Sequence, residues 1–173
     1  MPLILVTPLS LVETAIKRHK PSHLMTLLSP GHMIETPQGI RPGNHLKLGL
    51  NDVVATDLAD DPPNAQHIDD LIRFGRGWDA RAPLLIHCWA GISRSMAAAY
   101  IVLCDRFGPF REKEIAKSLR ARAPHAYPNP LLVEFADKAL GRNGRMSMAI
   151  ESIGRGTIVA EGDVVELPLS DEL

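Results

Sequence analysis

The feature that most constrains the fold is a pair of apolar segments on either side of a short loop. Residues 83–87 (PLLIH) form a short continuous apolar run, as expected of a strand that is covered on both faces. Residues 92–106 then predict a helix whose middle part, residues 96–104, carries no charge. A helix without a polar face belongs at the centre of a domain. A buried strand followed at once by a buried helix predicts an α/β domain built around this pair.

Strand and helix patterns alternate along the rest of the chain. Strands are predicted at three further places: residues 3–6, 23–28 and 45–50. Helices are predicted at five further places: residues 11–20, 64–78, 112–122, 131–140 and 143–153. Ser10 precedes the first helix as its N-cap, with Glu13 in the capping-box position. This order predicts a single α/β domain whose central sheet, mixed and mostly parallel, is flanked by helices.

Length, charge and hydropathy argue against several classes of partner. With 173 residues the chain has room for one well-buried domain. Its formal net charge is −1 and it contains no long basic run, which argues against nucleic acid as a ligand. No apolar stretch approaches the roughly 18 to 20 residues that a membrane-spanning helix needs. We therefore expect neither nucleic acid nor a membrane among the partners.

Both ends of the chain carry short patterns that resemble targeting signals. Residues 1–12 are apolar, but they lack a basic start and contain two prolines, so we interpret them as a strand and the start of a helix. Residues 170–173 (SDEL) resemble an endoplasmic reticulum retention signal, which has no use without entry into the lumen. We interpret them as an acidic tail. Two cysteines cannot build a disulfide framework, and this favours a reducing cytoplasm as the compartment.

The loop between the buried strand and the buried helix has the composition of an anion site. Amide N–H groups of such a loop and of the first helical turn converge, and the helix dipole adds to their field. The same field favours the thiolate form of Cys88, which opens the loop. Arg94 offers paired donors to two oxygens of a phosphate and keeps its charge. Gly91 permits the positive φ that a cradle of inward-facing amides demands. The pattern predicts a nucleophilic cysteine beside a bound anion.

Two neighbours of the loop complete this prediction. Ser95 is expected to hydrogen-bond the thiolate and to stabilise it as a leaving group. His87, at the end of the strand, is expected to fix the loop through hydrogen bonds to its backbone. The residues predicted to bind the phosphate lie in the loop and at the start of the helix: Trp89, Ala90, Gly91, Ile92, Ser93 and Arg94.

The segment HCWAGISRS, residues 87–95, resembles the His-Cys-x5-Arg-Ser/Thr signature of the cysteine-dependent protein tyrosine phosphatases, in its compact dual-specificity-like form. The likeness extends over about residues 23–140, and PLLIHCWAGISRS looks similar to small bacterial tyrosine-phosphatase-like proteins. It implies one phosphatase-like domain over residues 1–173, with residues 141–173 as a C-terminal helix and tail. It also implies a phosphotyrosine-phosphatase-like fold.

This resemblance implies a general acid on a loop before the cysteine, where an aspartate protonates the leaving oxygen. Four aspartates qualify by position: Asp52, Asp57, Asp60 and Asp61. We favour Asp52, because it continues the alternation of residues 45–50 and lies where that strand ends; Asp57 is the next choice. The segment PNPLLVEFADKAL, residues 128–140, resembles the Pro-Asn segment of the family, which implies that Asn129 lies near the catalytic loop.

The resemblance implies a two-step hydrolysis of phosphate monoesters that needs no metal and no organic cofactor. Cys88 attacks the phosphorus, Arg94 and the loop amides stabilise the oxygens, and Asp52 protonates the departing alcohol or phenol. The ionised aspartate then activates the water that hydrolyses the phosphocysteine, while Ser95 assists the departing thiolate. The expected partners are a phosphorylated protein or a small phosphate monoester, and phosphate, sulfate or vanadate as anions in the site.

The uncharged loop argues against highly anionic substrates such as inositol phospholipids, for which related phosphatases carry extra lysines. The choice among phosphotyrosine, phosphoserine and small phosphate esters stays open. Two other functions also stay open: a pseudophosphatase that binds a phosphorylated partner without turnover, and sulfur transfer by a rhodanese-like loop. Arsenate reduction is disfavoured, because in the related small phosphatases the cysteine lies near the N-terminus, whereas here it lies in mid-chain.

The remaining reactive side chains are interpreted as structural. Cys104 falls on the apolar helix and is expected in the core. Trp89 is expected either to line the mouth of the site or to pack on the sheet, and the sequence favours neither. His87 is assigned to the loop, and none of the other histidines has a paired metal-ligand spacing such as i, i+4, so we expect no metal site. These six histidines are His19, His23, His32, His45, His67 and His125.

Overall fold

A five-stranded sheet forms the centre of the computed structural model, which describes residues 2–169. The strands are β1 (Leu3–Pro8), β2 (His23–Leu28), β3 (His45–Gly49), β4 (Leu84–Cys88) and β5 (Val165–Pro168). Their order is β3-β2-β4-β1-β5; the first four are parallel, and β5 runs antiparallel to β1. The SDEL segment lies outside the described residues.

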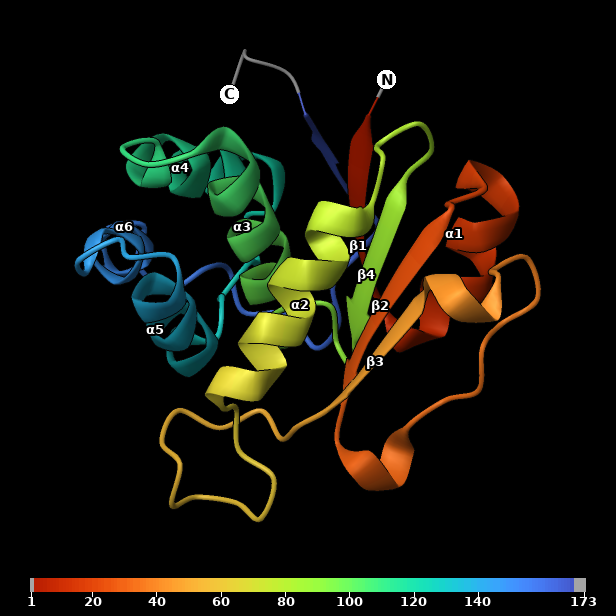
Figure 1. The fold of residues 1–173 in the computed structure, drawn as a ribbon, viewed down its shortest axis with the longest axis horizontal. Helices are drawn as coiled ribbons and strands as arrows, with labels where there is room; N and C mark the ends of the chain where they lie inside the picture. The colour runs from red at the N-terminus through yellow and green to blue at the C-terminus, as the bar shows by residue number, and fades with distance from the viewer. Residues whose placement is uncertain (1, 170–173) are drawn as a thin grey trace.

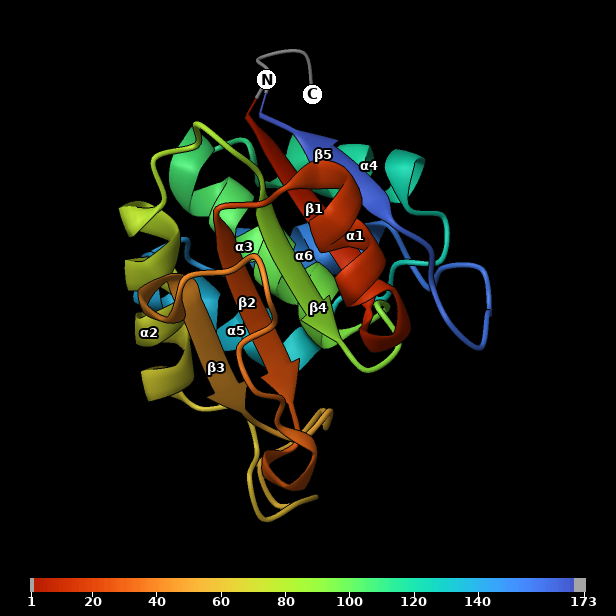
Figure 2. The ribbon, with the colours of Figure 1, turned by 90° about the vertical axis from the view of Figure 1, so that its right-hand side faces the viewer.

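Six helices cover the two faces of this sheet. They are α1 (Val12–His19), α2 (Ala65–Gly77), α3 (Arg94–Phe107), α4 (Glu112–Arg122), α5 (Pro130–Ala139) and α6 (Arg145–Ser152). Figures 1 and 2 show α1 alone on one face and the other helices on the opposite face, with α3 against the sheet. The predicted fold, an α/β domain with a mixed, mostly parallel sheet flanked by helices, is confirmed. None of the helices within residues 2–169 is long and apolar enough to cross a bilayer.

Alternate residues of the central strand β4 serve the two faces of the sheet. Ile86 and Cys88 belong to the larger core, which includes the whole apolar length of α3. Leu85 belongs to a smaller core with α1 residues on the other face. His87 is fully buried and shares this second face by alternation. Cys88 and His87 therefore point to opposite sides of the sheet at the same strand end.

Two predictions for the chain ends are wrong or incomplete. Ser10 does not cap α1, because residues 9–11 form a 3₁₀ turn and the Ser10 hydroxyl donates instead to Glu161 at 2.7 Å. Residues 141–173 hold more than a helix and a tail, because Val165–Pro168 form the fifth strand. This short segment gains its hydrogen bonds only by pairing with β1, so its own sequence carries little signal.

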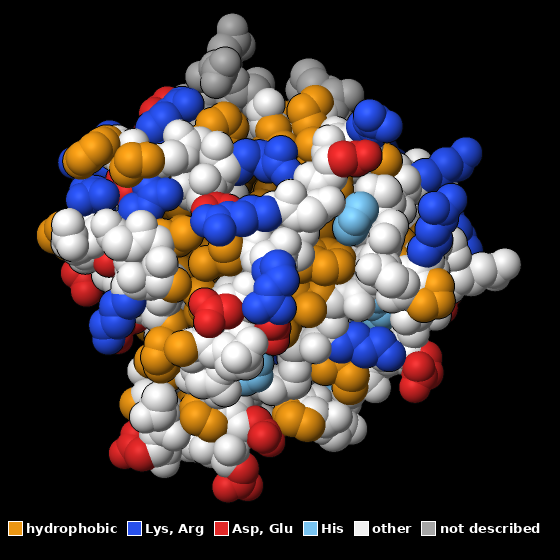
Figure 3. Space-filling view, viewed as in Figure 1, with side chains coloured by type: hydrophobic (Ala, Val, Ile, Leu, Met, Phe, Trp, Pro, Cys, Tyr) orange, Lys and Arg blue, Asp and Glu red, His pale blue; other side chains and the backbone are white. Residues whose placement is uncertain are grey.

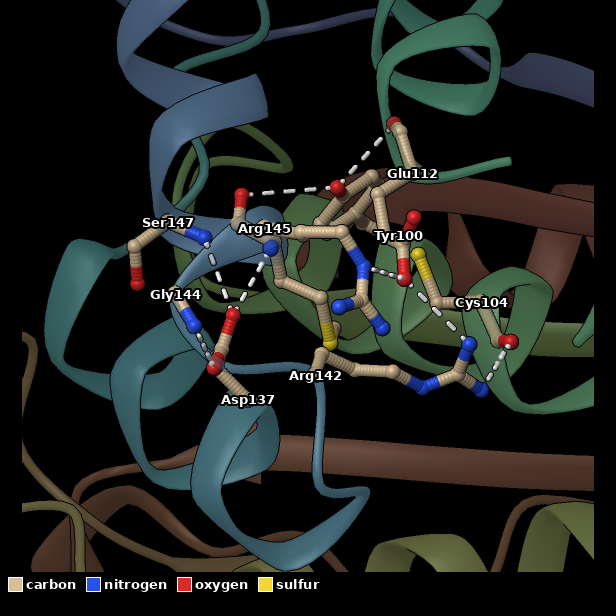
Figure 4. A network of polar contacts seen from close by, with 9 residues as sticks. Tyr100, Cys104, Glu112, Asp137, Arg142, Gly144, Arg145 and Ser147 are labelled. Carbon is tan, nitrogen blue, oxygen red and sulfur yellow. Dashed lines mark hydrogen bonds and ion pairs between the residues drawn. The ribbon is translucent and has the colours of Figure 1, made fainter. Parts of the chain in front are cut away.

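A buried polar network joins four of the helices on the α3 side of the sheet (Figure 4). Glu112 accepts ion pairs from Arg142 and Arg145, each at 3.3 Å, and Arg142 also donates to the Cys104 carbonyl at 2.9 Å. Asp137 accepts from the amides that begin α6, those of Gly144, Met146 and Ser147. The Tyr100 hydroxyl, whose pKa burial raises, donates to the Glu112 carbonyl. The network ties α3, α4, α5 and α6 together.

We expect Arg142→Met to lower the free energy of unfolding by about 3 kcal/mol, because it leaves the buried Glu112 carboxylate with one partner fewer. Urea denaturation followed by circular dichroism measures this. Arg76→Met is the matched control, because Arg76 pairs with Asp105 at the surface, where one ion pair contributes under about 1 kcal/mol. Equal losses of unfolding free energy in the two variants would contradict the expectation that the buried ion pair contributes more than the surface one.

Candidate active site

The loop of residues 89–93 connects β4 to α3, so the predicted order of strand, loop and helix is confirmed, with the strand ending one residue later than predicted and the helix starting later. β4 ends at Cys88, α3 begins at Arg94, and Ser93 is the N-cap residue of the helix. The Cys88 thiol is almost fully buried, and its Sγ lies 3.1 Å from Ser95 Oγ, in the first turn of α3. The structure therefore brings Cys88 and Ser95 into direct contact at the N-terminus of a fourteen-residue helix.

The carbonyl groups of this loop are held by neighbouring segments. Four backbone hydrogen bonds reach them: Leu9 N to Trp89 O at 3.1 Å, Gly162 N to Ala90 O at 2.8 Å, Tyr127 N to Ile92 O at 2.9 Å, and Asn129 N to Ser93 O at 3.2 Å. A loop whose carbonyls are tied outward presents its amide groups to the opposite side, and this is the arrangement of an anion-binding nest.

Gly91 is required at the centre of the loop. Its φ is +69°, in the left-handed region that disfavours other residues. A Cβ atom built there would lie 2.7 Å from the Pro8 nitrogen and 2.8 Å from the Thr7 carbonyl carbon. The positive φ predicted for Gly91 is confirmed. The loop packs directly against the backbone at the end of β1.

Arg94 is buried, and one side of its guanidinium is anchored. One terminal nitrogen donates to the Leu50 carbonyl at 2.9 Å. The Nε atom is also buried and has no hydrogen-bond partner within the described residues. A buried guanidinium N–H without a partner is costly unless an anion accepts it. Arg94 thus follows the loop at the end opposite Cys88 and has one buried N–H donor without a partner within the described residues.

Asp52 lies against this loop, and Asn129 holds it there. Asp52 Oδ1 accepts hydrogen bonds from Ser93 Oγ at 2.7 Å and from Asn129 Nδ2 at 2.8 Å. Asn129 also donates to the Val53 carbonyl at 3.0 Å and caps α5 by accepting from the Leu132 amide. The structure therefore brings together two residues that the sequence placed near the catalytic loop, Asp52 from the end of β3 and Asn129 from the start of α5.

The other three aspartates, Asp57, Asp60 and Asp61, lie further along the loop that follows β3. We call residues 51–61 the acid loop. This loop is closed at its base by the Asn51 amide, which donates to the Asp61 carbonyl at 2.7 Å. Val54 and Leu58 are each 60% exposed. The loop contains four aspartates and no Lys or Arg. In Figure 3 the lower end of the molecule, where this loop projects in Figure 1, shows carboxylates and apolar side chains but no cations.

His87 fixes the loop from the other face of the sheet. Its Nδ1 lies 3.2 Å from the Cys88 carbonyl oxygen, and its Nε2 lies 2.7 Å from Thr26 Oγ1. Burial lowers the pKa of His87 to about 4, so the ring is neutral at physiological pH. The predicted contact of His87 with the backbone at the cysteine is confirmed.

Sequence reasoning missed Thr26 and assigned His45 only a structural role. Thr26 Oγ1 lies 2.8 Å from His45 Nε2, and His45 Nδ1 lies 2.9 Å from Thr36 Oγ1. Burial lowers the pKa of His45 to about 4. The available signal was Thr26 itself, the lone hydroxyl inside the apolar strand HLMTLL.

The remaining side chains lie outside this contact network. Trp89 is 55% exposed and meets His32 edge to face, with ring centroids 5.4 Å apart, so its side chain projects from the loop rather than packing into the sheet. Cys104 is in the core as predicted, and burial raises its pKa to about 12. Neither cysteine is in a disulfide. Among residues 2–169, no three or more His, Cys, Asp or Glu side chains are grouped to hold a metal ion.

A cysteine and an arginine at the two ends of a loop between a buried strand and a buried helix occur here in the fold of the dual-specificity and tyrosine phosphatases. The chain is similar to DUSP15, with a TM-score of 0.63 and 17% identity over 88% of this chain and 91% of that one. It is also similar to human tyrosine phosphatase-like serine/threonine/tyrosine-interacting protein, with a TM-score of 0.64 and 18% identity over 80% and 91% of the two chains.

A third similar structure is PTPMT1 in complex with PI(5)P, with a TM-score of 0.56 and 15% identity over 87% of this chain and 91% of that one. No protein-family model and no curated protein sequence matches the chain. At these identities the likeness establishes the fold, and the chemistry has to be argued from the side chains of this chain.

Proposed function

We propose that this protein hydrolyses phosphate monoesters through a phosphocysteine intermediate, as a protein tyrosine or dual-specificity phosphatase. The observation that carries the proposal is the geometry around Cys88. Its thiol touches Ser95 at the N-terminus of α3, and the buried Arg94 at the far end of the same loop has an Nε donor without a partner. The similarity of the fold to dual-specificity phosphatases supports it.

The first step transfers the phosphoryl group to the cysteine. The Cys88 thiolate forms an S–P bond while the P–O bond to the leaving group breaks, so the leaving oxygen takes the electron pair. Arg94 and the loop amides stabilise the charge on the three equatorial oxygens. Asp52 donates a proton to the leaving oxygen; Ser93 and Asn129 hold its Oδ1, and within the described residues no hydrogen bond engages Oδ2.

The second step releases phosphate. The ionised Asp52 takes a proton from a water molecule, whose oxygen attacks phosphorus, and the S–P bond breaks. Ser95, 3.1 Å from Cys88 Sγ, donates its hydroxyl proton in a hydrogen bond to the departing thiolate. The site returns to its starting state with one phosphate and one alcohol or phenol formed from ester and water. Every group in this cycle belongs to the chain, so no cofactor is required.

A phosphorylated protein or a small phosphate monoester fits this site better than a polyanion. The loop residues 89–93 carry no charge, and the neighbouring acid loop carries four aspartates. PTPMT1 was solved with the phosphoinositide PI(5)P; in this chain the aspartates of the acid loop, of which Asp52 contacts Ser93, would repel the additional phosphates of such a ligand. The proposed chemistry also requires a free thiol, which a reducing compartment such as the cytoplasm maintains.

Hydrolysis of para-nitrophenyl phosphate in the presence of EDTA tests the proposal. We expect metal-independent turnover between about pH 5 and pH 8, inhibited by vanadate, because vanadate occupies the same loop as phosphate. Absence of turnover with phosphopeptides and aryl phosphates alike would contradict the enzymatic proposal.

A phosphate-binding protein without turnover is the alternative that one observation favours. One similar structure is named a tyrosine phosphatase-like interacting protein, so this fold is not confined to proteins called phosphatases. The contact between Cys88 and Ser95 argues for turnover, because it serves the departure of the thiolate rather than the binding of an anion. Phosphate binding without hydrolysis by the wild-type protein would establish the alternative.

We expect Asp52→Ala to lower kcat by about 10² to 10⁴-fold, with the larger loss for alkyl phosphates, whose leaving oxygen needs the proton most. Aryl phosphates with electron-withdrawing groups should lose less. Asp57→Ala is the matched control, because Asp57 lies on the same acid loop without the contacts of Asp52 to Ser93 and Asn129. Steady-state rates over a series of leaving groups measure both variants. If Asp57→Ala fails while Asp52→Ala keeps its rate, the acid is Asp57.

A further inference from the structure

We propose that Thr26 and His45 are positioning residues of the catalytic loop, acting through His87 on the carbonyl of Cys88. Together with Thr36 they form a chain of hydrogen bonds, the relay, which runs from a surface loop across three strands to the nucleophile. The inference rests on the proposed function where it concerns turnover. Its effect on the thiol of Cys88 can be measured without any phosphatase activity.

Each group in the relay lies within hydrogen-bonding distance of the next. Thr36 Oγ1 lies 2.9 Å from His45 Nδ1, and His45 Nε2 lies 2.8 Å from Thr26 Oγ1. Thr26 Oγ1 lies 2.7 Å from His87 Nε2, and His87 Nδ1 lies 3.2 Å from the Cys88 carbonyl oxygen. All four contacts are within normal hydrogen-bond length.

The sheet builds the relay by register. β2 lies between β3 and β4, and Thr26 is opposite His87 in the β2–β4 ladder. Thr26 is also opposite Lys47 in the β2–β3 ladder, and His45 shares the face of Lys47 because it lies two residues away. Three neighbouring strands therefore present these polar side chains on one face, the face opposite α3. This face is otherwise filled by the apolar residues of the smaller core.

The direction of every hydrogen bond follows from the last one. A carbonyl oxygen only accepts, so His87 Nδ1 carries a proton, and in the neutral ring Nε2 must accept from the Thr26 hydroxyl. That hydroxyl has one proton, so it accepts in turn from His45 Nε2–H. His45 is neutral as well, and its Nδ1 accepts from the Thr36 hydroxyl. Each donor thus fixes the tautomer of the next ring.

Fixing the tautomer of His87 has a consequence for the anion site. The bond from His87 polarises the peptide group that joins Cys88 to Trp89, and the N–H of that peptide group belongs to the loop beside the thiol. If His87 adopted the other tautomer, an unprotonated Nδ1 would face the carbonyl and repel it. Thr26 prevents this, because its hydroxyl donates a hydrogen bond to Nε2, and Nε2 can accept that bond only when it carries no proton.

Charged groups act on the two rings from neighbouring elements. Lys47 lowers the pKa of His45 and Glu35 raises it, while Arg94 and His45 lower the pKa of His87. Burial is the largest effect on both rings and favours the neutral forms. The relay therefore keeps one arrangement of protons at physiological pH.

Alkylation of Cys88 by iodoacetamide tests the relay directly, with Cys104→Ala as the background so that one thiol reacts. We expect Thr26→Val to lower the alkylation rate at about pH 6.5 roughly tenfold and to move the rate profile to higher pH, as expected for the loss of one buried hydrogen bond. Thr26→Ser keeps the hydroxyl and should restore the wild-type profile. His45→Leu should give a smaller loss, and it serves as the second variant if Thr26→Val does not fold.

Thr7→Val is the matched control. Thr7 is opposite His87 on the other side, in the β1–β4 ladder, and its buried hydroxyl has no partner within the described residues. It should alkylate like the wild type. Nitrogen NMR of the histidine rings should show His87 protonated at Nδ1 in the wild type and altered by Thr26→Val. The proposal is overturned if Thr26→Val matches Thr7→Val in alkylation, or if His87 carries its proton at Nε2.

Turnover separates this proposal from the proposed function. In an active enzyme, Thr26→Val should lower kcat about tenfold with little change in KM, because the relay acts on the nucleophile and not on substrate contacts. A protein that hydrolyses no phosphate ester but still shows the alkylation difference would refute the phosphatase and leave the relay standing.

Discussion

Cys88→Ser is expected to abolish turnover, with a loss in kcat on the order of 10³-fold or more, as for removal of any covalent nucleophile. A serine hydroxyl stays protonated where a cysteine forms a thiolate, and within the described residues no general base lies against this position: the one side chain in hydrogen-bond contact with Sγ is Ser95. Steady-state hydrolysis of para-nitrophenyl phosphate with EDTA measures the loss.

Anion binding by Cys88→Ser should persist within about threefold of the wild type, because Arg94 and the loop backbone remain and supply most of the donors to a bound oxyanion. Calorimetric titration with inorganic phosphate measures it. Cys104→Ala is the matched control: Cys104 is the second buried thiol, on the same helix, and its replacement should leave kcat unchanged. Turnover that survives in Cys88→Ser would place the nucleophile elsewhere, and equal losses in both cysteine variants would point to a damaged fold.

Arg94→Lys is expected to lower kcat/KM by about 10² to 10³-fold and to weaken phosphate binding as well. An ammonium offers a point charge in place of the planar fork, so it cannot donate to the Leu50 carbonyl and to a phosphate with the geometry that the guanidinium has. Because both readouts fall, this variant differs from Cys88→Ser, in which only turnover falls. Rates and phosphate titration on the same preparation measure the pair.

Arg155→Lys is the control for this second prediction. Arg155 lies over the Tyr127 ring, close to the segment that binds the catalytic loop, but it is not part of the loop. It should keep both activity and phosphate affinity within about twofold, as surface substitutions usually do. If Arg94→Lys retains full affinity for phosphate, the anion does not bind where the loop and Arg94 converge, and the proposed mechanism is wrong.

The parts of the site that could be predicted from the sequence are those contiguous in it. Cys88, Gly91, Arg94 and Ser95 lie within eight residues, and the strand and helix around them are uniform in hydropathy, so local pattern alone placed them. Asn129 was predicted from the resemblance of its segment to the phosphatase family. Asp52 was predicted from that resemblance together with the alternating pattern of residues 45–50. The structure brings both to Ser93.

Thr26 and His45 could not be predicted in this way, because their contact with His87 depends on the order of the strands. The arrangement β3-β2-β4 makes neighbours of residues that no local periodicity relates. The fifth strand was missed for a similar reason, since a four-residue segment pairs with β1 only after the rest of the sheet exists. The Ser10 cap was wrong because a 3₁₀ turn and Glu161, distant in sequence, compete for that hydroxyl.

The hydrogen bond from Gly162 to Ala90, next to β5, bears on when the proposed site takes shape during synthesis. The catalytic loop rests on the end of β1, and β1 is held on its outer side by β5. The loop is therefore shaped by contacts between the first and last strands, and contacts between segments so distant in sequence carry a large loop-closure cost during folding. A nascent chain that still lacks residues 162–168 contains Cys88. The loop beside Cys88 then lacks the hydrogen bond from Gly162, and β1 lacks its pairing with β5.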